Sequence, residues 1–235
     1  MSEKLNATCQ GKSVSIECRR PSFESVRQAY KTINDEYKNG GAKAVFEKIG
    51  GELYREFLNN EKIVISQNEQ IQRGIPIAHN NMRYSLNSCA LRISYALNYS
   101  KLLGQYYLIN NKRLPNNTGA LRYENKQWFG DDKNLYYMSV YGIRNFLTLN
   151  WGNSDKPYHL QTFKNKDEVR HFYKSKFSKF DKSGIIVMRI KGFADAGGHT
   201  TLWNGEYKQF EDFEISENYL IGNHSVVDFQ FWELK

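Results

Sequence analysis

The sequence of 235 residues predicts an α+β fold, in which helices come first and an antiparallel sheet follows. Before residue 180, apolar residues recur mostly at three- and four-residue spacing, which is typical of helices packed on a core. From Gly184 onward the spacing changes to two, which is typical of strands. No internal repeat or shift in composition divides the chain, so we expect one domain.

The first predicted helix begins near Ser22, which can cap its first turn, and has Glu24 close behind. Residues 1–19 before it are polar and show no obvious element. The helix breaks at Gly40-Gly41, continues as a shorter helix over residues 42–49 and ends at Gly50-Gly51. Its apolar positions follow helical spacing: Val26, Ala29, Tyr30 and Ile33.

A polar stretch from Glu52 to Tyr84 carries only short apolar pieces and predicts a loop with at most one strand. The next helix begins at Asn87 or Ser88, either of which can cap it. One face is apolar and includes Cys89, Ile93, Ala96 and Leu97. Cys89 therefore lies at the helix tip, where the amides and the helix dipole stabilise a thiolate. An unpaired cysteine here also fits ordinary core packing.

Residues 103–133 are irregular, with turn signals between aromatic residues that either anchor the segment to the core or line a groove. A short strand is expected over residues 136–140. Helices are expected over Val140–Trp151 and, with a basic amphipathic pattern, over Asp167–Phe180. Three strands then complete the predicted sheet: Ile185–Ile190, His199–Trp203 and Val226–Phe231.

Of the five histidines, only His199 begins a predicted strand, and two glycines before it allow another chain to approach closely. Asn204-Gly205 is a strong signal for a two-residue hairpin turn, which would place His199 opposite Phe210. Asp212 would then share the face of His199 at diagonal reach, whereas Glu211 would point away. Asp212 is therefore the predicted partner of the imidazole, and the other nearby carboxylates, Glu206 and Glu211, are the alternatives.

Composition limits the classes of function. The formal charge of +8 suits an anionic partner, but no run of basic residues indicates a nucleic-acid site. No apolar stretch is long enough to span a membrane, and the first residues lack a signal peptide. Cys9 and Cys18 either close a small disulfide loop or stay reduced. The spacing of Cys and His residues predicts no metal site, and no glycine-rich phosphate loop predicts a nucleotide cofactor.

Residues 87–98 (NSCALRISYALN) and 194–205 (ADAGGHTTLWNG) resemble the two signatures of the fourth family of type VI secretion amidase effectors. The resemblance extends over about residues 20–235 and implies a papain-like cysteine amidase fold, with N-terminal helices packed on an antiparallel sheet. Residues 1–19 would form an N-terminal extension, and insertions would lie near 55–80 and 105–133. Supporting matches are Arg20–Phe23, Ile49–Gly51, Leu147–Gly152 and Phe231-Trp232.

The resemblance implies a hydrolase that cleaves the γ-D-glutamyl–meso-diaminopimelate bond of peptidoglycan. Such an antibacterial toxin would leave the producer through the secretion apparatus, without a signal peptide, and act in the periplasm of the target bacterium. An immunity protein would protect the producer. Cys89 takes the role of the nucleophile and His199 that of the base, with Asp212 as third member. We expect the backbone amide of Cys89 to be one oxyanion donor.

Two other classes of function fit parts of the sequence. A non-catalytic basic module could bind the cell wall or nucleic acid, and would show salt-sensitive binding without a reactive thiol. A thiol hydrolase of another amide would share the catalytic residues and differ only in its substrate.

Overall fold

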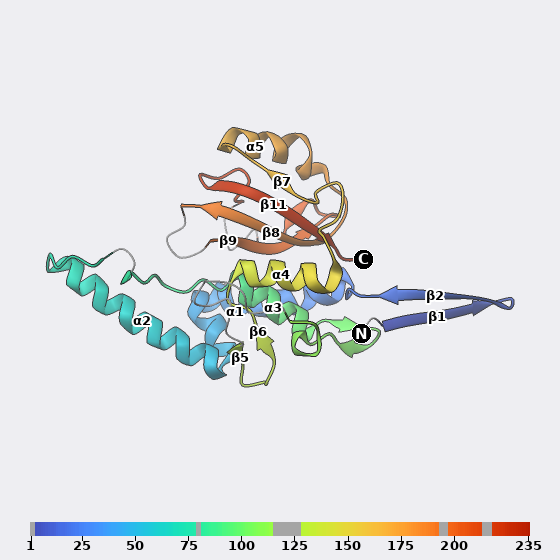
Figure 1. The fold of residues 1–235 in the computed structure, drawn as a ribbon, viewed down its shortest axis with the longest axis horizontal. Coiled ribbons are helices and arrows are strands. Elements are labelled where there is room, and N and C mark those ends of the chain that lie inside the picture. The colour runs from blue at the N-terminus through green and yellow to red at the C-terminus, as the bar shows by residue number, and fades with distance from the viewer. Residues whose placement is uncertain (1–2, 79–80, 115–127, 193–196, 213–217) are drawn as a thin grey trace.

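A five-stranded antiparallel sheet lies between two layers of helices (Figure 1). The computed structural model describes residues 3–78, 81–114, 128–192, 197–212 and 218–235. On one side of the sheet lie three helices: α1 (Phe23–Ile49), α3 (Cys89–Tyr99) and α4 (Val140–Trp151). Helix α5 (Lys166–Ser175) lies on the other side. The predicted α+β arrangement of helices on an antiparallel sheet is therefore confirmed.

The strands of this sheet follow the order β10-β9-β8-β11-β7, and every neighbouring pair is antiparallel. Their alternating side chains divide the core into two apolar clusters. Ile185 and Leu202 belong to the cluster formed with α1, α3 and α4, whereas Ile186 and Trp203 belong to the cluster under α5. The strands are β7 (Gln161–Thr162), β8 (Gly184–Lys191), β9 (Gly198–Asn204), β10 (Gln209–Phe210) and β11 (Ser225–Glu233).

Helix α1 begins and bends where its sequence predicts. The Ser22 hydroxyl caps the helix by accepting a hydrogen bond from the Ser25 amide at 3.3 Å. At Gly40 and Gly41 the backbone leaves the helical conformation, and Gly41 has a positive φ of 65° that suits glycine. The helix ends at Gly50. Its buried face packs on α3 and so supports the helix that carries Cys89.

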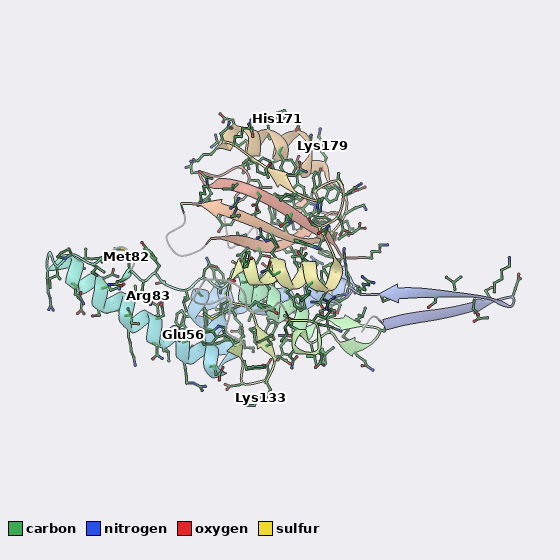
Figure 2. All side chains as sticks on the ribbon, viewed as in Figure 1. Glu56, Met82, Arg83, Lys133, His171 and Lys179 are labelled. Carbon is green, nitrogen blue, oxygen red and sulfur yellow. The ribbon has the colours of Figure 1, made fainter. Side chains whose placement is uncertain are left out.

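The prediction of a loop over residues 52–84 is wrong, because Gly51–Gln72 forms the helix α2. This helix projects from the molecule and buries only its first half, so it has no apolar stripe along its full length (Figure 1). The chain after it returns along α2: the Gln67 side chain bonds the Asn81 carbonyl and the Arg83 amide, both at 2.8 Å. Figure 2 shows Met82 and Arg83 beside the outer part of α2, with Glu56 nearer its base.

Residues 1–19 were predicted to carry no element, but a β-hairpin projects there, formed by β1 (Glu3–Cys9) and β2 (Lys12–Cys18) (Figure 1). The turn falls at Gln10-Gly11, where both φ angles are positive. Cys9 pairs with Lys12 at the tip, and Cys18 pairs with Glu3 at the other end, about 20 Å away at the usual rise of a strand. This separation excludes a disulfide between them, and both are free thiols.

The two remaining predicted helices are present, and several short strands form that the sequence does not predict. Helix α4 has the expected bounds, Val140–Trp151, and is capped by Ser139, which the sequence analysis assigned to a strand. The helix expected over Asp167–Phe180 divides into Lys166–Ser175 and a short turn, Phe177–Lys179. In place of a strand over 136–140, only β6 (Leu135–Tyr136) forms, paired with β5 (Trp128–Phe129). Another short pair consists of β3 (Lys101–Leu102) and β4 (Gln105–Tyr106).

Aromatic residues of the irregular segment mostly anchor it to the core. Tyr107 and Trp128 are buried, and the Tyr107 hydroxyl accepts a hydrogen bond from the Trp151 indole at 2.8 Å. Tyr106 is exposed. Residues 115–127, which belong to the predicted insertion near 105–133 and include Tyr123, lie outside the described residues. Among the helices that the structure describes, none is both long and apolar enough to cross a bilayer.

Candidate active site

Cys89 is the first residue of α3, a helix whose residues from Cys89 to Asn98 are all buried. The helix contacts α1, α4 and β9, which explains why its burial is not confined to the predicted apolar face. Of the two predicted caps, Asn87 serves the first turn: its side-chain oxygen accepts a hydrogen bond from the Cys89 amide at 2.8 Å. The thiol thus lies at the positive end of a helix, as predicted.

The bond between Asn87 and the Cys89 amide corrects one expectation. We expected this amide to donate to a substrate oxyanion, but in the structure its hydrogen is already bonded to the Asn87 side chain. A backbone N–H carries a single hydrogen, so the amide serves the helix cap instead. We therefore assign no oxyanion donor to it.

His199 is the second residue of β9 and lies opposite Met188 of β8. A side chain at Gly198 would collide with the Met188 carbonyl oxygen. The predicted close approach therefore occurs at this glycine, where the backbone of β8 lies against it. A side chain at Gly197 would meet no atom within 4 Å, so the steric need for glycine does not extend to that position. Residues 194–196 of the second signature lie outside the described residues.

The hairpin after β9 does not have the predicted register. Its loop contains four residues, 205–208, and Trp203 pairs with Phe210 rather than with Glu206. The difference is an even number of residues, so each side chain keeps its predicted face. Asp212 therefore still lies on the face of His199, and the Asp212 carboxylate accepts a hydrogen bond from the His199 Nε2 at 3.0 Å.

The structure brings the three predicted site residues together from α3, β9 and the segment after β10. His199 bonds the Asp212 carboxylate through Nε2. It also forms a hydrogen bond with the Cys89 thiol, and because Nε2 is taken, this bond uses Nδ1. All three are almost completely buried: Cys89 is 2%, His199 3% and Asp212 2% exposed. Hydrogen bonds and charges act strongly at such a site because little water screens them.

The alternative carboxylates are placed elsewhere. Glu211 accepts hydrogen bonds from Arg27 Nε and from the Asn204 side-chain amide, each at 2.7 Å. Glu206 is exposed in the hairpin loop. His171 is also distant from the site, on α5 at the far side of the sheet (Figure 2), and His79 lies outside the described residues.

The pKa values of the three groups are shifted in the directions that favour a thiolate and an imidazolium. Burial alone raises the pKa of Cys89, but the hydrogen bond and charge of His199, aided by Arg92, hold it below its ordinary value. Burial lowers the pKa of His199, whereas Asp212 and Cys89 together raise it to about 9. Burial raises the pKa of Asp212, but His199 and Arg92 lower it to about 2. These shifts favour the thiolate–imidazolium pair over the neutral thiol and imidazole.

Several neighbours of the site were missed by the sequence reasoning. The Tyr30 hydroxyl lies 3.2 Å from the Thr201 hydroxyl, which in turn bonds Asp212. The Tyr219 ring lies against the His199 imidazole, with centroids 4.4 Å apart. The guanidinium of Arg92 is buried beside Asp212. Arg92 and Thr201 had usable signals. Arg92 follows Cys89 by three residues on one face of a helix, and Thr201 follows His199 by two on one face of a strand.

Nothing in this arrangement is suited to a metal. Among the described residues, no three His, Cys, Asp or Glu side chains lie close enough to hold an ion. The hydrogen-bonded thiol, imidazole and carboxylate are instead the parts required for nucleophilic attack on an acyl group.

Comparison with known proteins identifies relatives of the chain. Residues 85–232, more than half of it, match the family described as type VI secretion system (T6SS), amidase effector protein 4, or Tae4. No curated protein sequence matches the chain.

Solved structures with a similar fold also exist. The effector Tae4 from Enterobacter cloacae is 24% identical with a TM-score of 0.53, covering 92% of this chain and 98% of that one. The effector Tae4 from Salmonella typhimurium, solved with the immunity protein Tai4 from Enterobacter cloacae, is 21% identical with a TM-score of 0.52, covering 92% and 100%. At this identity the likeness supports the fold, which in these structures is papain-like.

Proposed function

Since the chain belongs to the Tae4 family of type VI secretion effectors, it is a peptidoglycan amidase, and we propose that it cleaves the γ-D-glutamyl–meso-diaminopimelate bond with Cys89 as nucleophile. One observation carries the proposed mechanism: the chain of hydrogen bonds that joins Cys89, His199 and Asp212 in a buried site. The assignment of the bond rests on the family resemblance of the two signature segments.

The proposed reaction has two halves. The Cys89 thiolate attacks the γ-carbonyl carbon of the glutamyl residue, and the His199 imidazolium gives its proton to the leaving amine of diaminopimelate. A thioester to Cys89 remains. Water then attacks this thioester, His199 takes the proton of the water, and the thiolate leaves. Asp212 keeps the imidazole oriented and stabilises its positive charge in both halves.

We infer that the protein acts on the cell wall from the periplasm of the target bacterium. A type VI effector is delivered into other bacteria, and its peptidoglycan substrate lies in that compartment. A cognate immunity protein would bind the effector in the producing cell, as Tai4 binds Tae4 in the solved complexes. Neither role requires insertion into a membrane.

Digestion of purified sacculi tests the proposed bond directly. We expect mass spectrometry to show fragments with a free γ-carboxyl on D-glutamate and a free amine on diaminopimelate, because hydrolysis of that amide creates both ends. Cleavage at a different amide would leave the cysteine mechanism intact and refute the assigned bond. Binding to sacculi without release of any fragment would favour the non-catalytic module.

The pH dependence of kcat/KM is expected to be bell-shaped. Activity should rise as Cys89 becomes a thiolate, at a pH below the ordinary value for cysteine, because His199 lowers the pKa of the thiol. Activity should fall as pH passes about 9, because deprotonated His199 can no longer protonate the leaving amine. Initial rates on a soluble disaccharide–peptide, measured from about pH 4 to about pH 10, check both limbs. A rate that keeps rising up to about pH 10 would contradict the role of the imidazolium.

A further inference from the structure

We propose that Arg92 is a positioning residue of the active site, whose buried positive charge holds both the Asp212 carboxylate and the Cys89 thiolate in their ionised forms. This inference rests on the proposed function, because it assigns a purpose to a group behind the proposed nucleophile. It also gives α1 a role in the site, because residues of that helix hold the Arg92 guanidinium in place.

The position of Arg92 follows from the helix that carries Cys89. Arg92 comes three residues after Cys89 in α3, so both lie on one face, with the guanidinium one turn deeper. Its Nη2 lies 3.7 Å from Asp212 Oδ2, on the carboxylate oxygen that also bonds His199. One carboxylate oxygen therefore faces two cationic groups, Arg92 and protonated His199.

Two residues of α1 fix the guanidinium from behind. Arg92 Nη1 donates a hydrogen bond to the Asn34 side-chain oxygen at 2.9 Å, and Asn34 itself is buried. The guanidinium also lies over the Tyr37 ring, 4.4 Å from its centroid, where the negative face of the ring attracts it. These contacts aim the charge at Asp212 without neutralising it, because both partners from α1 are uncharged.

Burial of this arginine is costly unless its charge is used. Arg92 is only 2% exposed, and its Nε has no hydrogen-bond partner among the described residues. The contact with Asp212 is longer than a hydrogen bond, so the guanidinium acts there through its charge. An arginine that served packing alone would be expected to satisfy its donors or to be replaced by an apolar residue.

The charges of the site explain what this cation achieves. In the ionised state that the proposed reaction needs, the site holds two anions, the Cys89 thiolate and Asp212, and one cation besides Arg92, the His199 imidazolium. With Arg92 the four charges sum to zero. Without it a net negative charge would be buried, and the thiol would hold its proton to higher pH.

Other titratable groups face this cluster and have to be considered. Tyr30 and Tyr37 face Arg92 from α1, and Tyr219 faces His199 from the segment after residue 217. Burial raises the pKa of Tyr30 and of Tyr219, so both hydroxyls stay neutral where the site titrates. His224 contacts the Tyr219 ring, with centroids 4.9 Å apart. The variant His224→Asn therefore reports whether that imidazole contributes to a measured pH profile.

The test is the pH dependence of Cys89 alkylation by iodoacetamide, together with the acid limb of kcat/KM on the soluble disaccharide–peptide. In Arg92→Gln we expect both to move to higher pH by about one unit or more, because a cation beside the thiolate is lost. Arg92→Lys keeps a positive charge, so both pH dependences should lie close to those of the wild type. A structural role alone would lower kcat or stability at every pH and leave the acid limb unmoved.

The matched control is Arg20→Gln. Like Arg92, Arg20 pairs with a carboxylate, that of Asp155, and lies over an aromatic ring, that of Trp151, but these residues are not part of the site. It should leave the acid limb in place. If Arg92→Gln does not fold, Asn34→Asp tests the same claim: a carboxylate of the same size would offset the charge of Arg92, so the acid limb should again rise.

An acid limb that stays in place in the folded Arg92 variant, or in Asn34→Asp, would overturn the inference. Failure of the proposed function would look different. The wild-type protein itself would then release no peptidoglycan fragments and would show no selective alkylation of Cys89.

Discussion

The Cys89→Ala variant is expected to lose all measurable cleavage of sacculi while keeping the wild-type fold. Removal of the nucleophile from a nucleophile–base pair typically lowers kcat by about 10⁵-fold or more, because the remaining groups cannot form the covalent intermediate. The substitution deletes one sulfur atom at the tip of α3, and the Asn87 cap bonds the backbone amide, which alanine retains. Circular dichroism and thermal unfolding should therefore resemble those of the wild type.

Cys9→Ala is the matched control for this experiment. Cys9 is an exposed free thiol at the tip of the projecting hairpin, so its loss should leave the rate of cleavage unchanged. Iodoacetamide should likewise inactivate the wild type and the Cys9 variant at the same rate. Substantial release of muropeptides by Cys89→Ala would refute the proposed mechanism, since Cys89 is the nucleophile that bonds His199 in the part of the chain that the structure describes.

The sequence was sufficient to predict the elements that hold the site. The α1 and α4 boundaries depend on local signals, a serine cap at one end and a glycine at the other, and these signals do not need tertiary contacts to be interpreted. The strand pattern after Gly184 was equally clear because both faces of that strand are buried over much of its length. Elements with caps or with continuous burial could therefore be found from the residues alone.

The projecting elements could not be found by the same signals. Helix α2 buries few residues, so hydrophobic periodicity, the main sign of a helix, is weak along it. The hairpin β1–β2 does alternate, with Val14, Ile16 and Cys18 on one strand, but its Gln10-Gly11 turn is a weaker signal than Asn-Gly. Of α2, only Leu53 and Phe57 near its start are buried members of a core cluster. The function of neither projecting element follows from the site.

The prediction of Asp212 depended on a register that proved wrong by an even number of residues. A shift by an odd number would have placed Glu211 on the face of His199 instead. What the hairpin argument lacked was the environment of each carboxylate: Glu211 is held by Arg27 and Asn204, whereas Asp212 lies among His199, Thr201 and Arg92. The two arginines come from α1 and α3, and no local pattern in residues 204–212 could indicate them.

Asp212→Asn is expected to lower kcat about 100-fold or more while leaving the protein folded, since the side chain keeps its size. The carboxylate accepts the hydrogen of His199 Nε2 and so leaves Nδ1 for the thiol. An asparagine amide can instead donate to Nε2, which favours the wrong tautomer, and it removes the charge that raises the pKa of His199 to about 9. The alkaline limb of kcat/KM should therefore also move to lower pH.

Glu211→Gln provides the comparison, because Glu211 neighbours Asp212 in sequence and is also held by a hydrogen-bonded cation, Arg27. Its loss should cost some stability, since a paired carboxylate that is largely buried is removed, but the alkaline limb should stay near pH 9. The reverse result, with a shifted limb in Glu211→Gln and an unshifted one in Asp212→Asn, would show that the imidazole depends on Glu211. Asp212 bonds the His199 ring, whereas Glu211 bonds Arg27 of α1. The two pH profiles therefore separate a carboxylate that orients the base from one that joins α1 to the hairpin.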